Sequence, residues 1–146
     1  MLLVKAYVVT PIRVNGPSMN STLKDGDIMF LNEITYRFKD IKRFDIVVIK
    51  YDDEYIIKRV IGLPGEVISY KNNKLYINGK YVKEDFKHKD TLDFESVQIG
   101  DNEYFVMGDN RVNSLDSRVI GPISKKSIKG RAKLTILPFK RFGIKK

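Results

Sequence analysis

A serine and a lysine are the residues of this chain whose settings could support nucleophilic chemistry. Ser18 follows Gly16 and Pro17 in a turn-like stretch, and Lys58 lies within the apolar run Tyr55–Val60. A serine hydroxyl becomes a useful nucleophile only when a base takes its proton. A lysine can be that base if burial disfavours its charged form and so lowers the pKa of its amine. The pair therefore indicates a hydrolase in which Lys58 activates Ser18.

Both residues also have ordinary interpretations. Strand lysines usually extend their amines to water, and serine is common in turns. If residues 55–61 form a strand, however, Lys58 shares a face with Ile56 and Val60, whose apolar side chains would strip water from its ammonium. Gly16 would let a ligand approach the backbone closely, and backbone N–H groups near Ser18 could bind an oxyanion.

The amino-acid composition excludes several other kinds of catalytic or metal site. The chain has no cysteine, which excludes disulfides, cysteine nucleophiles and thiolate metal sites. Its one histidine, His88, lies in a charged run, where we expect a solvated loop residue and only a weak alternative as part of a Ser-His-Asp triad. A single histidine cannot build a histidine-rich zinc site. We therefore expect no metal and no cofactor.

The net charge of +9 favours contact with nucleic acid or with an anionic membrane surface, although it could also serve solubility alone. Residues 1–9 are apolar apart from Lys5, but they fall short of the ~20 residues that a membrane-spanning helix needs. They could be the end of an anchor or a first strand. Residues 136–146 mix aromatic and basic side chains, as a surface tail or a membrane-interface segment would.

The elements that must position these residues are mostly strands. Short runs rich in β-branched and aromatic residues, separated by turn signals, predict strands at 28–31, 45–49, 55–61, 67–70, 74–77 and 103–107. Asn78-Gly79 predicts a two-residue hairpin, and single helical turns are expected at 18–24 and at 124–128, the latter capped by Ser124. We therefore expect one all-β, mostly antiparallel domain over 1–146, in which about 69–101 form an inserted cap of hairpin and loop.

Four stretches then resemble, in order, the soluble sequence boxes of type I signal peptidases. They are residues 14–23, 43–49, 55–66 and 104–118, the last containing Gly-Asp-Asn-Arg-Val-Asn-Ser-Leu-Asp-Ser-Arg. Residues 125–143 are also similar to the C-terminal segment of the smaller, Gram-positive-like members. The similarity covers most of the chain outside 69–101, where that family is variable. The family consists of membrane-bound Ser/Lys endopeptidases that remove signal peptides from exported proteins.

The resemblance implies a role for each matching residue. Ser18 would be the nucleophile and Lys58 the general base, with Ser114 orienting the lysine amine. Two supporting ion pairs are implied, Arg59 with Asp109 and Asp116 with Arg118. The oxyanion would be bound by backbone N–H groups at Ser18 and Gly16, because Gly16 stands where some members carry a serine hydroxyl. Pocket walls for Ala-like side chains would include Ile12, Val14, Met19, Leu23 and Ile57.

The resemblance also implies partners and a place in the cell. Signal peptides of exported preproteins would add as a strand along residues 11–16 and 53–58, so that cleavage follows Ala-x-Ala-like sites. The domain would lie on the extracytoplasmic face of the cell membrane, against anionic lipid, with the family's N-terminal anchor absent or truncated, and without a nucleic-acid partner. One departure is Ser21, which stands where the family usually has proline.

Three alternatives fit parts of this pattern. A self-cleaving repressor-type Ser/Lys peptidase would share the chemistry, but we find no helix-turn-helix pattern in this chain. A basic all-β nucleic-acid-binding module would explain the charge and the aromatic content. An inactive paralogue of a peptidase would accommodate Ser21.

Overall fold

The chain forms two antiparallel sheets in the computed structural model, which describes residues 9–20, 22–32 and 41–137. The larger sheet contains β1 (Val9–Arg13), β2 (Ile28–Asn32), β3 (Ile46–Tyr51), β4 (Glu54–Gly62), β9 (Glu103–Met107), β10 (Ile123–Ser124) and β11 (Ile128–Leu137). The smaller sheet contains β5 (Val67–Lys71), β6 (Lys74–Ile77), β7 (Lys80–Val82) and β8 (Phe94–Gln98). The all-β, antiparallel class predicted from the sequence is confirmed.

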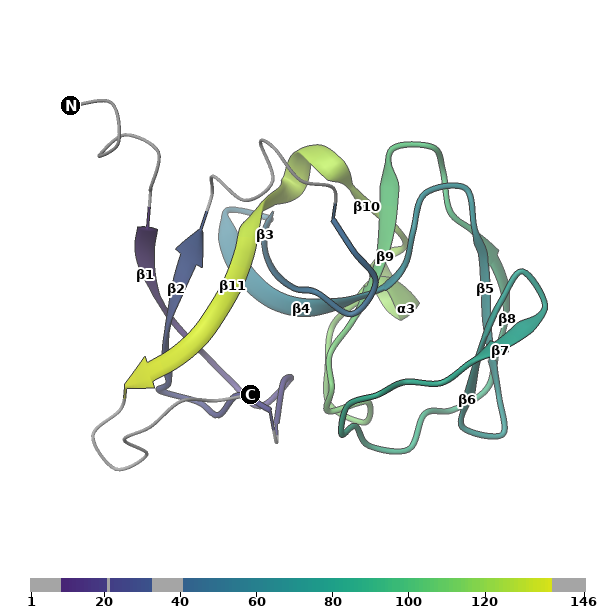
Figure 1. Cartoon of the computed structure of the whole chain (residues 1–146), viewed down its shortest axis with the longest axis horizontal. Coiled ribbons are helices and arrows are strands. Elements are labelled where there is room, and N and C mark those ends of the chain that lie inside the picture. Colours follow the sequence, from purple (N-terminus) through teal and green to yellow (C-terminus); the bar gives the residue numbers. More distant parts are fainter. Residues whose placement is uncertain (1–8, 21, 33–40, 138–146) are drawn as a thin grey trace.

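The order of the strands places the two chemically interesting segments in one sheet. The larger sheet runs β1-β2-β11-β3-β4-β9-β10, so β4 lies near its middle and β1 at its edge (Figure 1). The smaller sheet, of order β7-β6-β5-β8, lies to one side, at the end of the molecule opposite β1 and β2 (Figure 1). It is built from residues 67–98, which nearly coincide with the segment expected to form an inserted cap.

Local sequence signals account for several of these elements. Asn78 and Gly79 both have positive φ, 52° and 82°, and they join the paired residues Ile77 and Lys80, which confirms the predicted hairpin. Ser124 accepts a hydrogen bond from the N–H of Lys126 and caps the short 3-10 helix η1 (Lys125–Ser127), as expected. In the expected helical turn at 18–24, the N–H of Leu23 donates to the carbonyl of Met19 at 2.8 Å, as in one turn of a helix.

Other elements were not predicted. The short helix α3 (Ser117–Ile120) follows directly on Asp116, which is its N-cap. Strand β11 pairs with β2 on one side and β3 on the other, so it is held by partners about 80 to 110 residues away rather than by a local signal. The expectations for residues 1–8, for Ser21 and for residues 138–146 lie outside the described residues. Within the described ranges, no helix is long and apolar enough to cross a membrane.

Strand β4 organises the core because its side chains reach three separate clusters. Ile57 packs with Val14, Met19 and others in one cluster, and Ile61 packs with the smaller sheet in a second. Val60, on the other face, belongs to a third cluster with β3 and β9. This alternation is the one predicted for residues 55–61, and it leaves Lys58 on the same face as Val60.

Candidate active site

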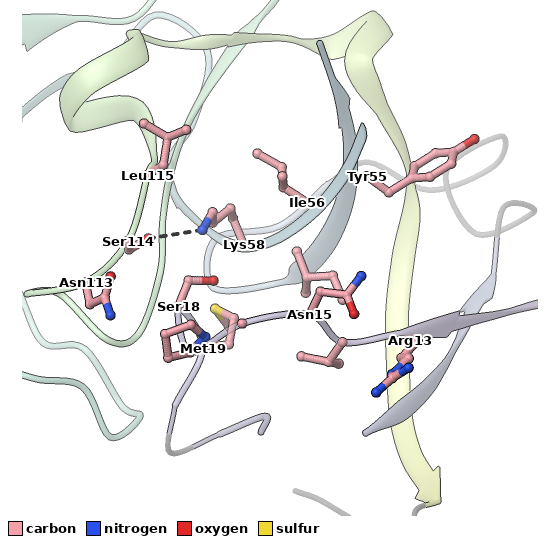
Figure 2. Close-up of a pocket in the computed structure, with 14 residues that line it drawn as sticks. Arg13, Asn15, Ser18, Met19, Tyr55, Ile56, Lys58, Asn113, Ser114 and Leu115 are labelled. Atoms are coloured by element: carbon pink, nitrogen blue, oxygen red, sulfur yellow. Dashed lines mark hydrogen bonds between the residues drawn. The ribbon is translucent and has the colours of Figure 1, made fainter. Parts of the chain in front are cut away.

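Three segments that lie far apart in the sequence line one pocket. They are residues 13–19, at the end of β1 and in the turn after it, residues 55–58 of β4, and residues 113–115 in the loop after β9 (Figure 2). Ser18, Lys58 and Ser114 therefore meet at the same place. The β-sheet achieves this because β4 pairs with β9, while the turn after β1 packs Met19 against Ile57 of β4.

Lys58 is buried at this site, with only 4% of its surface exposed. Burial lowers the pKa of its amine to about 8, since the charged form loses hydration, while the negative charge of Asp116 partly opposes that change. The amine donates a hydrogen bond of 3.1 Å to Ser114 Oγ (Figure 2). A substantial fraction of Lys58 is therefore neutral near pH 8, as a general base must be.

Ser114 connects the lysine to a buried carboxylate. Its hydroxyl accepts from Lys58 and donates to Asp116 Oδ2 at 2.8 Å. Asp116 also accepts from the Gly108 N–H and, through both carboxylate oxygens, from Arg118 at 2.9 and 2.8 Å. Burial alone would raise the pKa of Asp116, but the hydrogen bonds from Arg118 and Gly108 lower it overall. The carboxylate thus stays charged and holds Ser114 in place.

Ser18 reaches the pocket from the segment 13–19, separate from β4, which carries Lys58, and from the loop that carries Ser114. Figure 2 shows its hydroxyl and the Lys58 amine facing the same space. Within the described residues, no hydrogen bond joins the two side chains, and the lysine donates to Ser114 instead. Catalytic hydrogen bonds are often long before substrate binds, so this geometry is compatible with proton transfer from Ser18 to Lys58.

The backbone near Ser18 differs from the expectation for Gly16. The N–H of Gly16 donates to Asp25 Oδ1 at 2.9 Å, so it is already engaged and cannot serve as an oxyanion donor in this arrangement. Gly16 has φ +87°, a conformation that favours glycine at this turn. Of the two expected oxyanion donors, the N–H of Ser18 is the one that makes no hydrogen bond within the described residues.

Arg59 and Asp109 form a buried, bidentate ion pair behind the pocket. Arg59 Nε and Nη2 donate to the two Asp109 oxygens at 3.0 and 2.8 Å. Arg59 follows Lys58 in β4 and therefore points to the other face of the sheet. Thr22, which the sequence analysis did not single out, donates to Asp109 Oδ2 at 2.6 Å. This pair ties the segment after Ser18 to β4 and to the loop after β9, and it does not line the pocket.

Gly108 is a further residue that the sequence analysis missed. A Cβ at this position would lie 2.2 Å from Ser114 Oγ and 2.6 Å from the carbonyl oxygen of Ser18. Only glycine lets these two segments come so close. Its place at the start of the Gly-Asp-Asn-Arg motif was the available signal.

The expected pocket residues divide into two groups. Val14, Met19 and Ile57 line the pocket. Leu23 is buried in the cluster beneath it and Ile12 packs against that cluster, so neither lines the pocket. The sequence does not separate these two residues from the three that line the pocket, because all five are apolar. Packing decides which of the side chains face the open space. Arg13, Asn15, Tyr55 and Ile56 also line the pocket and belong to the runs expected to pair with substrate, whereas Asn113 and Leu115 were not anticipated.

His88 is not the solvated loop residue that was expected. Its side chain is mostly buried, with Nε2 3.2 Å from Glu84 Oε1 and its ring beside that of Phe86. The hydrogen bond to Glu84 raises the pKa of His88. His88 does not line the pocket of Ser18, so the alternative of a Ser-His-Asp triad has no support in this arrangement.

Within the described residues, no group of histidine and carboxylate side chains could hold a metal ion. The fold and the pocket together define an all-β domain that brings a serine, a buried lysine and a supporting serine to one site. These are the groups that a hydroxyl nucleophile activated by an amine base requires.

Comparisons with known proteins assign the family. The sequence profile described as "Signal peptidase, peptidase S26" matches residues 1–137. The chain is 46% identical to signal peptidase I V of Bacillus subtilis over 143 residues, which span 87% of this chain and 85% of that protein. It is 36% identical to signal peptidase IB of Staphylococcus aureus in an alignment of 163 residues, gaps included, which covers 97% of this chain and 85% of that protein. The chain therefore belongs to the signal peptidase family, and it is a peptidase of the signal peptidase I type.

A solved structure agrees with this assignment. The crystal structure of a signal peptidase I from Enterococcus faecalis matches with a TM-score of 0.58 and 34% identity, over 64% of this chain and 97% of that chain. The family membership favours a peptidase over the nucleic-acid-binding module and the repressor-type protein considered from sequence.

Proposed function

We propose that this domain cleaves signal peptides from exported preproteins with Ser18 as the nucleophile and Lys58 as the general base. The observation that carries the proposal is the burial of Lys58, which lowers the pKa of its amine to about 8, in the same pocket as Ser18. A neutral amine next to a hydroxyl supplies the base that a serine nucleophile requires. The family assignment supplies the substrate class.

The reaction follows from these groups. Neutral Lys58 takes the proton of Ser18 as Oγ attacks the scissile carbonyl, and the Ser18 N–H donates to the oxyanion that forms. Protonated Lys58 then gives its proton to the leaving amine, which departs as the new N-terminus of the mature protein. Lys58 next takes a proton from water, whose oxygen attacks the acyl-enzyme. Release of the signal peptide's carboxyl end returns the proton to Ser18 Oγ.

The pocket walls support cleavage after small residues. Residues 13–16 and 55–58 form two walls of the pocket, and an extended peptide could pair with their backbones between them. Val14, Met19 and Ile57 are buried apolar side chains of the wall. Together with the family assignment, an apolar wall of this kind favours small apolar side chains of the substrate. The proposed site is therefore Ala-x-Ala, cut after the second alanine.

We also propose that the domain works at the extracytoplasmic face of the cell membrane, where signal peptides emerge. Tyr55 and Leu115 line the pocket and are 56% and 52% exposed, so the rim of the site offers apolar surface. The net charge of +9 would favour anionic lipid.

The test is cleavage of a synthetic peptide containing one Ala-x-Ala site, in detergent or lipid, with products read by mass spectrometry. We expect one cut after the second alanine, none with Ser18→Ala, and a loss of about 10²- to 10⁴-fold with Lys58→Met. Circular dichroism would check that each variant is folded. Cleavage by the folded Ser18→Ala variant would overturn the dyad, and a folded but inactive wild-type domain would indicate an inactive paralogue.

A further inference from the structure

Asn110 donates hydrogen bonds to the two carbonyl groups nearest the Ser18 N–H, those of Pro17 and of Ser18 itself. Asn110 Nδ2 donates to the carbonyl of Pro17 at 3.1 Å, and the Asn110 backbone N–H donates to the carbonyl of Ser18 at 2.8 Å. The Pro17 carbonyl also accepts from the N–H of Asn20 at 3.0 Å. The hydrogen bonds to the Pro17 oxygen therefore fix the orientation of the Pro17–Ser18 peptide group.

Fixing this oxygen also fixes the direction of the Ser18 N–H. In a trans peptide the N–H and the preceding C=O lie in one plane and point in opposite directions. Asn110 does not line the pocket, whereas Pro17 and Ser18 do. With the oxygen drawn toward Asn110, the Ser18 N–H points away from it, to the pocket side. Within the described part of the chain, this N–H has no protein acceptor.

The other atoms of the Asn110 side chain show what the amide contributes. Asn110 is 8% exposed, and its Oδ1 is buried without a hydrogen-bond partner. A buried acceptor without a donor destabilises a fold, and an aliphatic side chain would avoid that cost. The reverse orientation of the amide would place Oδ1 against the Pro17 oxygen. What the amide adds at this position is thus the hydrogen bond to Pro17.

We propose that Asn110 is the positioning residue of the oxyanion hole. It holds the Pro17–Ser18 peptide plane so that the Ser18 N–H is aimed at the developing oxyanion before substrate arrives. This inference rests on the proposed function, in which Ser18 is the nucleophile and its own N–H is the oxyanion donor. Donors that need no reorientation during the reaction are the ones that stabilise a transition state most.

The experiment compares Asn110→Ala and Asn110→Leu with wild type. Asn110→Leu keeps much of the side-chain volume, so it guards against misfolding of the alanine variant. We expect kcat for the Ala-x-Ala peptide to fall about 10- to 100-fold in both, with KM changed less than about threefold, because a misaligned donor affects only the transition state. Asn102→Ala, at an exposed turn, is the matched control and should keep wild-type kcat.

Two further readouts separate positioning from general damage. A peptide aldehyde forms a hemiacetal with Ser18, its oxygen lying in the oxyanion hole, so its affinity should fall by about the same factor as kcat. The midpoint of the pH–rate profile, which reports Lys58, should stay at its wild-type value. Unchanged kcat and aldehyde affinity in a folded Asn110→Leu variant would overturn the inference, as would a rise in KM alone. Failure of the proposed function gives a different result, namely cleavage by Ser18→Ala or an inactive wild-type domain. Either of these results would also remove this inference.

Discussion

At the scale of single residues, the proposed chemistry depends on the protonation state of the Lys58 amine. Lys58 would have little use as a base if its amine reached water, because its pKa would then keep it charged at physiological pH. Its position on β4, the hydrogen bond to Ser114 and the neighbouring charges of Asp116 and Arg118 together determine how much of it is neutral. Burial has the largest effect, and the two charges act in opposite directions.

The first prediction concerns pH. Protonated Lys58 cannot accept the Ser18 proton, so kcat/KM for the peptide should rise with pH and level off above a midpoint near 8, the pKa of the free enzyme's base. A pH–rate profile with a folded-state check at each pH measures this. A midpoint near 10.5, the value of an unperturbed lysine, would show that burial does not tune this amine.

The second prediction separates the charge of Asp116 from burial. Its negative charge raises the pKa of Lys58, so Asp116→Asn should move the midpoint of the profile to lower pH. The maximal rate should also fall, because Ser114 loses the carboxylate that holds it. The shift is the informative quantity, since damage to the fold alone would lower the rate without moving the midpoint in this direction.

The third prediction concerns Gly108. In Gly108→Ala the new methyl group would overlap Ser114 Oγ and the Ser18 carbonyl, so both walls of the site must move apart. We expect kcat/KM to fall by about 100-fold, the size of effect that a displacement of about 1 Å can cause. Gly100→Ala is the matched control, because its methyl would meet only the flexible Glu103 carboxylate. Equal losses in the two variants would contradict the steric explanation.

At the scale of elements, the smaller sheet and its loops support the loop after β9 through buried charges. Arg111, in the loop after β9, donates to Glu84 at 2.6 Å, to Tyr70 and Thr91, and to the carbonyl of Gly108. All of these except Gly108 belong to the smaller sheet or its loops. The guanidinium of Arg59 also lies over the ring of Phe86, with 4.1 Å between its carbon and the ring centre.

The fourth prediction tests this support by Glu84→Gln. Burial alone would raise the pKa of Glu84, but contacts with His88 and Arg111 lower it to about 2, so Glu84 stabilises the fold at neutral pH and loses that effect as the pH falls toward 2. Removing its charge leaves the Arg111 guanidinium buried without a counter-charge. We expect the free energy of unfolding to fall by about 3 kcal/mol in denaturant titrations. Glu95→Gln, at an exposed position of β8, is the control.

His88 offers a direct readout of the same contact. It is the one histidine of the chain, so its imidazole signal in an NMR titration needs no assignment. The hydrogen bond to Glu84 raises the pKa of His88 in the folded protein. Protonated His88 therefore stabilises the fold fully at a pH below the ordinary pKa of histidine, and this stabilisation is lost as the pH rises through the raised pKa. In Glu84→Gln the pKa should return toward the ordinary value. An unchanged pKa would mean that the contact does not form in solution.

At the scale of the whole molecule, net charge and exposed apolar side chains support the proposed contact with a membrane surface. The net charge is +9, and the exposed apolar residues Tyr55, Leu115 and Val112 lie at or next to the pocket rim. Basic charge attracts a domain to anionic lipid over about a Debye length, ~10 Å at 0.1 M salt. Exposed apolar groups can then enter the interface.

The fifth prediction is that the domain cosediments with vesicles containing anionic lipid more than with neutral vesicles, and that added salt weakens the difference. Leu115→Ser should reduce binding to both kinds of vesicle, because it removes apolar contact without changing charge. Equal binding to anionic and neutral vesicles would remove the electrostatic contribution from the proposal.

The sequence by itself determined the class of fold and most strands of the sheets, and it singled out Ser18 and Lys58, which the structure places in one pocket. Alternation over 55–61, short β-branched runs and the Asn78-Gly79 turn are local signals, and local backbone preferences decide them. The Gly-Asp-Asn-Arg motif and its companions also indicated the family, because the order of residue types along a chain can be compared without knowing the contacts that they make.

Only the tertiary structure decided which atoms face one another. That Lys58 is buried rather than extended to water depends on β3, β9 and the loop at 113–115, which no local pattern encodes. Likewise, Leu23 and Met19 are similar by sequence, yet only one lines the pocket. The engagement of the Gly16 N–H by Asp25, the burial of His88 against Glu84 and the hold of Asn110 on Pro17 join residues up to 93 positions apart. Such contacts form because the packed sheets bring distant segments together, and that information lies in the fold as a whole.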